Sequence, residues 1–169
     1  STWEPFKNII IRRFIKSFHV DMSLAVEPDP ASYDSFNAFF TRQLKSDARP
    51  IASSMESITS PVDGSISQFG HIQAGKLVQA KGKEFTLLSL LGNDQSLAAK
   101  YMDGDFITLY LSPRDYHRIH MPIKGELESM MYVPGKLFSV SPTTTQGIDN
   151  LFARNERVIN IFNTEIGSM

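Results

Sequence analysis

Apolar side chains recur with helical spacing at the start of the chain, from Phe6 to Val20, and basic side chains fill the rest of this segment. The apolar stripe consists of Phe6, Ile10, Phe14 and Phe18, and it is widened by Ile11 and Ile15. The basic residues beside it are Lys7, Arg12, Arg13 and Lys16. A helix with this pattern can lie at the surface of an anionic membrane. The same stripe can also pack on the core of its own protein.

A second helix is expected after the break at residues 27–30, where Ser32 can cap it. Its apolar residues are Phe36, Phe39, Phe40 and Leu44. From residue 49 onwards Ser, Thr, Gly and Pro become frequent, and short alternating segments replace helical spacing. We therefore expect a helical, membrane-associating region over residues 1–48 and a β-rich domain over residues 49–169.

The alternating segments predict a mostly antiparallel, sandwich- or barrel-like domain, so that the fold class is α+β. Strands are expected at residues 66–69, 76–80, 105–111, 126–133 and 157–166, and short helices at 85–91 and 95–102. We expect residues 136–140 to return along residues 126–133 as a hairpin, and residues 143–147 to form a polar loop. The last strand is followed by no cap, turn or polar tail, and we interpret the chain as truncated at its C-terminus.

Composition narrows the range of functions. The 169 residues, 41% hydrophobic and 21% charged, suffice for one globular domain with a core. The net charge of -1 provides no general attraction to nucleic acid. The absence of cysteine excludes disulfides, thiol nucleophiles and cysteine-based zinc sites. The longest uncharged apolar runs are far shorter than the ~20 residues of a membrane-spanning helix.

The segment 111–122 concentrates the candidate chemistry, because it contains two imidazoles, a carboxylate, a phenol and two guanidinium groups between prolines. It follows an alternating strand, so these groups are expected on a loop. His117 and His120 can face one pocket and move protons near neutral pH. Structural alternatives remain open, since a histidine can merely cap carbonyl groups, and Asp63 before Gly64 can merely form a turn. A metallohydrolase site of both histidines with Asp115 or Asp63 is a further alternative.

Several segments together resemble bacterial phosphatidylserine decarboxylase. They are residues 61–64 (PVDG), 111–122, 132–140 and 150–158, supported by residues 36–40 and 80–82. They occur in the order expected for the N-terminal part of the proenzyme, which is most of its β chain. The resemblance extends over almost the whole chain.

The resemblance implies a lyase that processes itself. In this family a serine within a Leu-Gly-Ser-Thr motif attacks the preceding glycine carbonyl, and the cleavage leaves a pyruvoyl group on the small α chain. That carbonyl cofactor supports the conversion of phosphatidylserine to phosphatidylethanolamine. By resemblance, Asp63 and His120 match the pair that activates the serine, and His117 matches the histidine of the decarboxylation step.

The motif with the nucleophile is missing from the sequence, since Gly167–Ser168 lies in a setting that matches an earlier strand of the family. We therefore expect the pyruvoyl-forming serine to lie beyond Met169, and this chain alone to be inactive. The implied partners are phosphatidylserine, an anionic membrane surface and the α chain of the same proenzyme, and a homodimer is compatible with them. The implied location is peripheral, on the cytoplasmic face of the bacterial inner membrane. The alternative is a non-catalytic, β-rich membrane-binding module.

Overall fold

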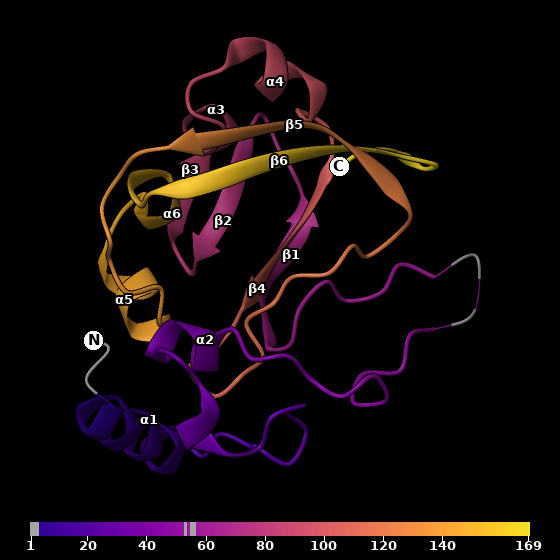
Figure 1. Ribbon diagram of the computed structural model, residues 1–169. Helices are drawn as coiled ribbons and strands as arrows, with labels where there is room; N and C mark the ends of the chain where they lie inside the picture. The colour runs from indigo at the N-terminus through magenta and orange to yellow at the C-terminus, as the bar shows by residue number, and fades with distance from the viewer. Residues whose placement is uncertain (1–3, 53, 55–56) are drawn as a thin grey trace. The chain divides into compact units, whose positions relative to one another are not determined.

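The computed structural model describes residues 4–52, 54 and 57–169 (Figure 1). Contacts between these residues divide the chain into two compact units. The first contains the described residues up to Gly64 together with Leu111–Ile123, and the second contains Ser65–Tyr110 and Lys124–Met169. The segment with the two histidines thus belongs to the same unit as the N-terminal helices, whereas composition alone suggests a border after residue 48.

The first unit begins with the expected helix, α1 (Glu4–Phe18). A short 3-10 turn, η1 (Pro30–Ser32), and a helix of five residues, α2 (Phe36–Phe40), follow. Ser35 caps α2 by accepting a hydrogen bond from the backbone N–H of Ala38, so the expected cap at Ser32 is wrong. Leu44 lies beyond the helix but is buried. The core of this unit consists of Ile11, Val20, Tyr33 and Phe39, with Phe14, Ile15, Phe36 and Phe40 packed around it.

Helix α1 has one apolar face in this core and further apolar side chains in solvent. Ile11 is 0% exposed, whereas Phe6 is 48% and Ile9 is 55% exposed. Phe14 stacks edge-on against Phe36, Phe39 and Phe40. Ile10 and Phe18 are exposed, as are Arg12, Arg13 and Lys16.

Lys7 differs from the other cations of α1, because it is buried. Its Nζ donates hydrogen bonds to the carbonyl oxygens of Tyr33, at 2.5 Å, and Ala31, at 3.4 Å. In this conformation its ammonium group is therefore unavailable to lipid headgroups. Of the helices in the described residues, none is long and apolar enough to cross a bilayer.

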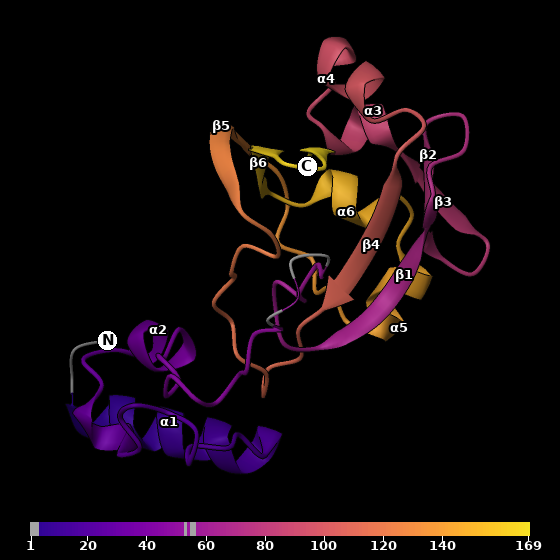
Figure 2. The ribbon, with the colours of Figure 1, turned by 90° about the vertical axis from the view of Figure 1, so that its right-hand side faces the viewer.

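The second unit contains three small antiparallel sheets. One pairs β1 (Ser65–His71) with β4 (Asp105–Tyr110), and another pairs β2 (Lys76–Ala80) with β3 (Lys83–Thr86). The third consists of β5 (Gly125–Val133), β6 (Arg157–Thr164) and β7 (Gly167–Ser168). The β1–β4 ribbon and the β2–β3 hairpin lie side by side (Figure 2). These elements confirm the α+β class and the antiparallel pairing, and the described strands form no closed barrel.

Four short helices join these strands: α3 (Leu87–Leu90), α4 (Gln95–Lys100), α5 (Pro142–Gly147) and α6 (Leu151–Arg154). Side chains of Thr86, Asp94 and Ser141 cap α3, α4 and α5. The core of the unit is formed by Ile72, Leu77, Phe85, Leu87, Leu91 and Ala98. The side chains of β2 and β3 therefore supply part of the core, and the helices close it.

One polar side chain lies in the middle of this unit. Gln79 on β2 is 0% exposed, and its Nε2 donates to the carbonyl oxygens of Thr145 (2.8 Å) and Ile148 (2.7 Å). Its Oε1 accepts from the backbone N–H of Leu151 at 2.7 Å. The buried amide is thus satisfied on both sides and fixes α5 and α6 to the strand.

Four expectations for this unit are wrong. The last strand is followed by a turn, because β6 ends at Thr164 and the chain returns as β7. Residues 136–140 form no hairpin with β5, because β5 pairs with β6 in a register from Val133↔Arg157 to Gly125↔Thr164. Residues 143–147 lie in helix α5 and not in a loop. Phe85 belongs to strand β3, so the helix expected from this residue begins only at Leu87.

Instead of the expected hairpin, Lys136 forms an isolated parallel β-bridge with Asn155. The backbone N–H of Lys136 donates to the Arg154 carbonyl at 2.8 Å, and that of Glu156 donates to the Lys136 carbonyl at 2.9 Å. A Cβ atom on Gly135 would lie 2.5 Å from backbone atoms of Asn155 and Glu156. Only glycine fits this close approach without displacing the backbone.

Candidate functional site

A cavity of about 460 Å³ lies in the first unit, where the turn at residues 60–63 meets the loop at residues 116–121. Backbone hydrogen bonds hold the two segments together: the N–H of His120 donates to the Pro61 carbonyl at 2.8 Å, and that of Thr59 to the Pro122 carbonyl at 2.9 Å. Leu44, Pro50, Ile51, Pro61, Val62 and Met121 supply apolar parts of the wall. Asp63, Tyr116 and His120 also line the cavity, so the two residues expected to act together reach one space.

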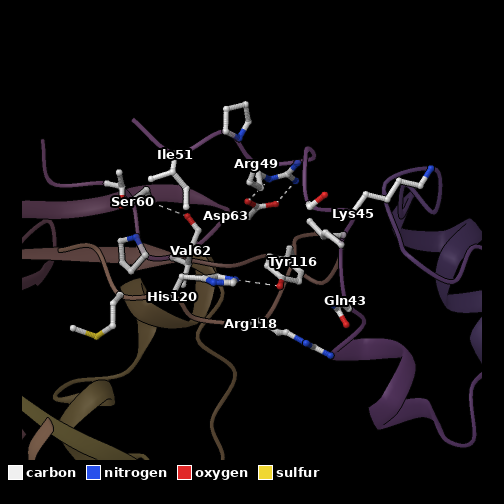
Figure 3. Close-up of a pocket in the computed structure, with 16 residues that line it drawn as sticks. Gln43, Lys45, Arg49, Ile51, Ser60, Val62, Asp63, Tyr116, Arg118 and His120 are labelled. Atoms are coloured by element: carbon white, nitrogen blue, oxygen red, sulfur yellow. Dashed lines mark hydrogen bonds and ion pairs between the residues drawn. The ribbon is translucent and has the colours of Figure 1, made fainter. Parts of the chain in front are cut away.

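Asp63 is held by a guanidinium group in this cavity. Arg49 donates from Nε to Oδ1 at 2.7 Å and from Nη2 to Oδ2 at 2.5 Å, and Figure 3 shows the two side chains facing each other. This bidentate bond from Arg49 is the main reason why the pKa of the Asp63 carboxyl is lowered, and the backbone N–H of Tyr116 contributes further. The side chain is therefore a fixed carboxylate at neutral pH.

His120 has a different partner. Its Nε2 shares a hydrogen bond of 3.1 Å with the Tyr116 hydroxyl group, and the two rings stack with their centroids 5.6 Å apart. Tyr116 is buried, whereas His120 is exposed toward the cavity side of the loop. Figure 3 shows the imidazole directed at the phenol and not at Asp63. Among the described residues Asp63 and His120 thus share a cavity without a hydrogen bond between them.

His117 is not among the residues that line this cavity. Its Nε2 lies 3.1 Å from the Ser112 carbonyl oxygen, and its ring stacks on Phe40 with a centroid separation of 4.0 Å. A carbonyl oxygen only accepts, so Nε2 carries the proton. Nδ1 is then the acceptor of the neutral ring, and it has no hydrogen-bond partner among the described residues. Burial is the main cause that lowers the pKa of His117, and it outweighs the opposing effects of the Ser112 carbonyl and Asp115.

Asp115 stabilises the turn at the start of the same loop. Its Oδ2 accepts hydrogen bonds from the backbone N–H and the hydroxyl group of Ser112, at 2.6 Å and 2.7 Å. This arrangement closes the turn that orients the following residues. In the part of the chain that the structure describes, no three His, Asp or Glu side chains are grouped so as to hold a metal ion.

Three residues of this region were missed by the sequence analysis: Arg49, Tyr116 and Phe40. Each contacts one of the candidate side chains. Arg49 and Phe40 lie in segments that we interpreted by composition or helical spacing, whereas Tyr116 lies in the candidate loop at residues 111–122 but was assigned no role there. The contact of Tyr116 was the easiest of the three to predict from the sequence, because Tyr116 precedes His120 by four residues on the same loop. The contacts of Arg49 and Phe40 span 14 and 77 residues of sequence, and no local pattern predicts them.

Comparison with known proteins identifies the family. The sequence profile described as "Phosphatidylserine decarboxylase" matches residues 36–169. A phosphatidylserine decarboxylase proenzyme of Alkalilimnicola ehrlichii is 55% identical over 164 residues, which are 97% of this chain and 57% of that protein. The proenzymes of Pseudoalteromonas translucida and Vibrio cholerae are 57% and 56% identical over 160 residues, which are 95% of this chain and 56% of each relative. The chain thus spans little more than half the length of these relatives, and it belongs to the phosphatidylserine decarboxylase family.

Proposed function

We propose that the protein to which this chain belongs converts phosphatidylserine to phosphatidylethanolamine by means of a self-derived pyruvoyl group. The observation that carries this proposal is the cavity that holds Asp63 and His120, two groups able to assist a serine nucleophile, in a chain that matches the family over residues 36–169. We also propose that the serine that becomes the cofactor, and the α chain that carries it, lie outside this sequence.

The cavity fits the self-cleavage step chemically. Asp63 is a carboxylate held in place by Arg49. The imidazole of His120 is hydrogen-bonded to the Tyr116 hydroxyl, a partner that another hydroxyl group can replace. An incoming serine hydroxyl can replace that phenol as the hydrogen-bond partner of Nε2, and it then transfers its proton to the imidazole. For Asp63 to stabilise the resulting imidazolium, the carboxylate and the imidazole must approach each other when the remaining chain is present.

His117 is suited to the later step of turnover. When bound, the pyruvoyl group supplies a carbonyl that accepts the electron pair left by the departing carboxylate. Nδ1 of the neutral His117 ring, which has no partner among the described residues, can accept a proton or, once protonated, return it, while Nε2 remains bonded to the Ser112 carbonyl. The two histidines thus have separate duties, and His117→Ala is expected to leave self-cleavage intact while it slows turnover at saturating lipid.

We further propose that α1 makes the contact with anionic membrane surfaces. Its exposed side chains include Phe6, Ile9 and Ile10, and the cations Arg12, Arg13 and Lys16 are also in solvent. Phe14 serves the core of the unit instead, and Lys7 binds backbone carbonyls. The proposed membrane contact therefore leaves out Phe14 and Lys7, which the sequence pattern had included.

The decisive experiment is the intact mass of the full-length gene product together with its reaction. We expect two chains, of which the smaller is blocked at its N-terminus by a pyruvoyl group, and release of carbon dioxide from carboxyl-labelled phosphatidylserine. Residues 1–169 purified alone are expected to release none, because imidazoles and carboxylates cannot accept the electron pair that stays on the substrate when carbon dioxide leaves. A single uncleaved chain that is nevertheless active, or an active fragment, would overturn the proposal. A single uncleaved and inactive chain would favour the non-catalytic membrane-binding module.

A further inference from the structure

The loop that carries His117 is held by the C-terminal end of α2 and the two residues after it. Thr41 accepts a hydrogen bond from Arg118 Nε on its carbonyl oxygen at 2.7 Å, and Arg42 donates from Nη2 to the Arg114 carbonyl at 3.3 Å. Phe40 comes directly before Thr41 and stacks on the ring of His117, which lies between Arg114 and Arg118 in sequence. The segment thus touches the histidine loop before, at and after His117.

The stacked pair has a defined geometry. The rings of Phe40 and His117 have centroids 4.0 Å apart and an interplanar angle of 25°. Phe40 also stacks on Phe36 with centroids 5.9 Å apart, and it meets Phe14 of α1 edge-on at 5.9 Å. Phe40 therefore connects the aromatic core of the unit with the imidazole, and its own position is fixed by that core.

Two contacts together determine the orientation of His117. The hydrogen bond to the Ser112 carbonyl fixes the position of Nε2. The imidazole ring can then still rotate about the line of this hydrogen bond. A phenyl ring stacked on one face removes that rotation, because turning the imidazole would break the stacking contact. The direction of Nδ1 is then set, and this is the atom that would exchange a proton with the substrate.

We propose that Phe40 is a positioning residue for His117, which holds the plane of the imidazole and excludes water from one of its faces. The proposal rests on the proposed function, in which His117 acts during turnover. It goes further by assigning the orientation of that histidine to a phenylalanine that is separated from it by 77 residues.

The electrostatic consequence follows from burial. Loss of contact with water is the main cause that lowers the pKa of His117. The charged groups that also act on it are Asp115 on its own loop, which raises the pKa, and Arg42 from the segment after α2, which lowers it. Removing the Phe40 ring leaves both charges in place and opens one face of the imidazole, so the pKa of His117 should rise.

The test uses Phe40→Leu in the full-length protein, with Phe40→Tyr as the conservative variant and Phe36→Leu as the matched control. Phe36 belongs to the same aromatic cluster and stacks on Phe40, but no contact joins it to His117 among the described residues. The His117 ring is titrated by NMR, self-cleavage is followed on gels, and turnover of phosphatidylserine is measured against pH.

For Phe40→Leu we expect a higher pKa of His117, normal self-cleavage and a kcat reduced roughly 10- to 100-fold, since the reacting nitrogen is misplaced. The acid limb of the rate profile should move to higher pH. Phe40→Tyr should restore both values, and Phe36→Leu should lower stability but leave the pKa unchanged. A Phe40→Leu protein with the parent pKa and parent kcat would overturn the proposal. If the full-length protein proves not to be a decarboxylase, the titration still decides whether Phe40 positions His117.

Discussion

Arg49 and Asp63 form a bidentate ion pair across 14 residues of sequence, with both carboxylate oxygens engaged. The pair joins the segment after the N-terminal helices to the turn before β1. It also gives Asp63 a partner other than the histidine with which we expect it to act. The ionisation of Asp63 is therefore secured before any nucleophile arrives.

Replacing Arg49 by Gln should reduce stability in a pH-dependent way. The pKa of Asp63 is lower in the folded protein than its ordinary value of about 3.9. The stabilisation is therefore complete above about pH 3.9 and is lost as the pH falls through this value toward the lower folded-state pKa. Because Arg49 is half exposed, we expect a loss of at most about 1 kcal/mol at neutral pH.

Urea unfolding of the parent and Arg49→Gln proteins between pH 3 and pH 7 provides the measurement. Arg13→Gln, which changes an exposed cation of α1, is the control. The difference between parent and Arg49→Gln should shrink toward the acid end. A difference that is the same at every pH would show that Arg49 acts by packing and not through the charge of Asp63.

The Asp63→Ala and His120→Ala variants of the full-length protein should fail to mature. Without the imidazole the serine proton has no acceptor, and without the carboxylate the imidazolium lacks its partner. We expect the rate of self-cleavage to fall by roughly 10²- to 10⁴-fold. A denaturing gel after expression gives the answer, and normal conversion to two chains would remove either residue from the maturation step.

Membrane binding by α1 should depend on its solvent-facing side chains. Phe6→Asp combined with Ile10→Asp places charges on the exposed face, so flotation of the full-length protein with anionic liposomes should decrease. Arg13→Gln should weaken binding by roughly 1 kcal/mol, an effect that added salt removes. Phe14→Asp is expected to unfold the unit instead, because Phe14 packs against three phenylalanines of α2. Unchanged flotation of the Phe6 and Ile10 double variant, with its fold intact, would exclude this surface from lipid binding.

Gln79 should be among the residues on which the second unit depends most. Gln79→Leu would leave the Thr145 and Ile148 carbonyls and the Leu151 N–H without their partner, and we expect a loss of at least about 2 kcal/mol. Gln146→Leu changes an exposed glutamine on α5 and should alter stability by less than about 0.5 kcal/mol. Thermal unfolding compares the two, and equal stabilities would mean that water replaces the Gln79 amide.

The sequence predicted well those elements whose signals are local. Helix α1 follows from the spacing of its apolar residues, and β2, β4 and β6 follow from alternation and flanking turns. Helix α5 was missed although Ser141 and Pro142 form a regular start signal, because the run of threonines was read as a loop. The partner of β5 could not be predicted from the turn at Pro134–Gly135, since register depends on a segment more than 20 residues away.

The site shows the same division between local and distant signals. His117, His120 and Asp63 are conspicuous because proton-transferring groups stand beside prolines and glycines on loops. Their contacts are set by Arg49, Tyr116 and Phe40, two of which are remote in sequence. Periodicity alone could not show which cations of α1 are exposed and which are buried either. Lys7 is buried because its ammonium group donates to the backbone carbonyl of Tyr33, a residue after the helix.

The close backbone contact at Gly135 determines how the second unit should unfold. Lys136 and Asn155 form a β-bridge there, so the segment between them, which contains α5 and α6, is closed into a loop. Hydrogen bonds from this loop to Gln79 connect it to β2. Breaking the bridge should free the β5–β6 sheet and also break the hydrogen bonds that connect the loop to β2. The sheet of β5 and β6 and the sheet of β2 and β3 should therefore unfold in one cooperative event. In Gly135→Ala, where the added carbon meets backbone, we expect hydrogen exchange to accelerate together in β2, α5, α6 and β6. Acceleration confined to the residues next to position 135 would show that the sheets open independently.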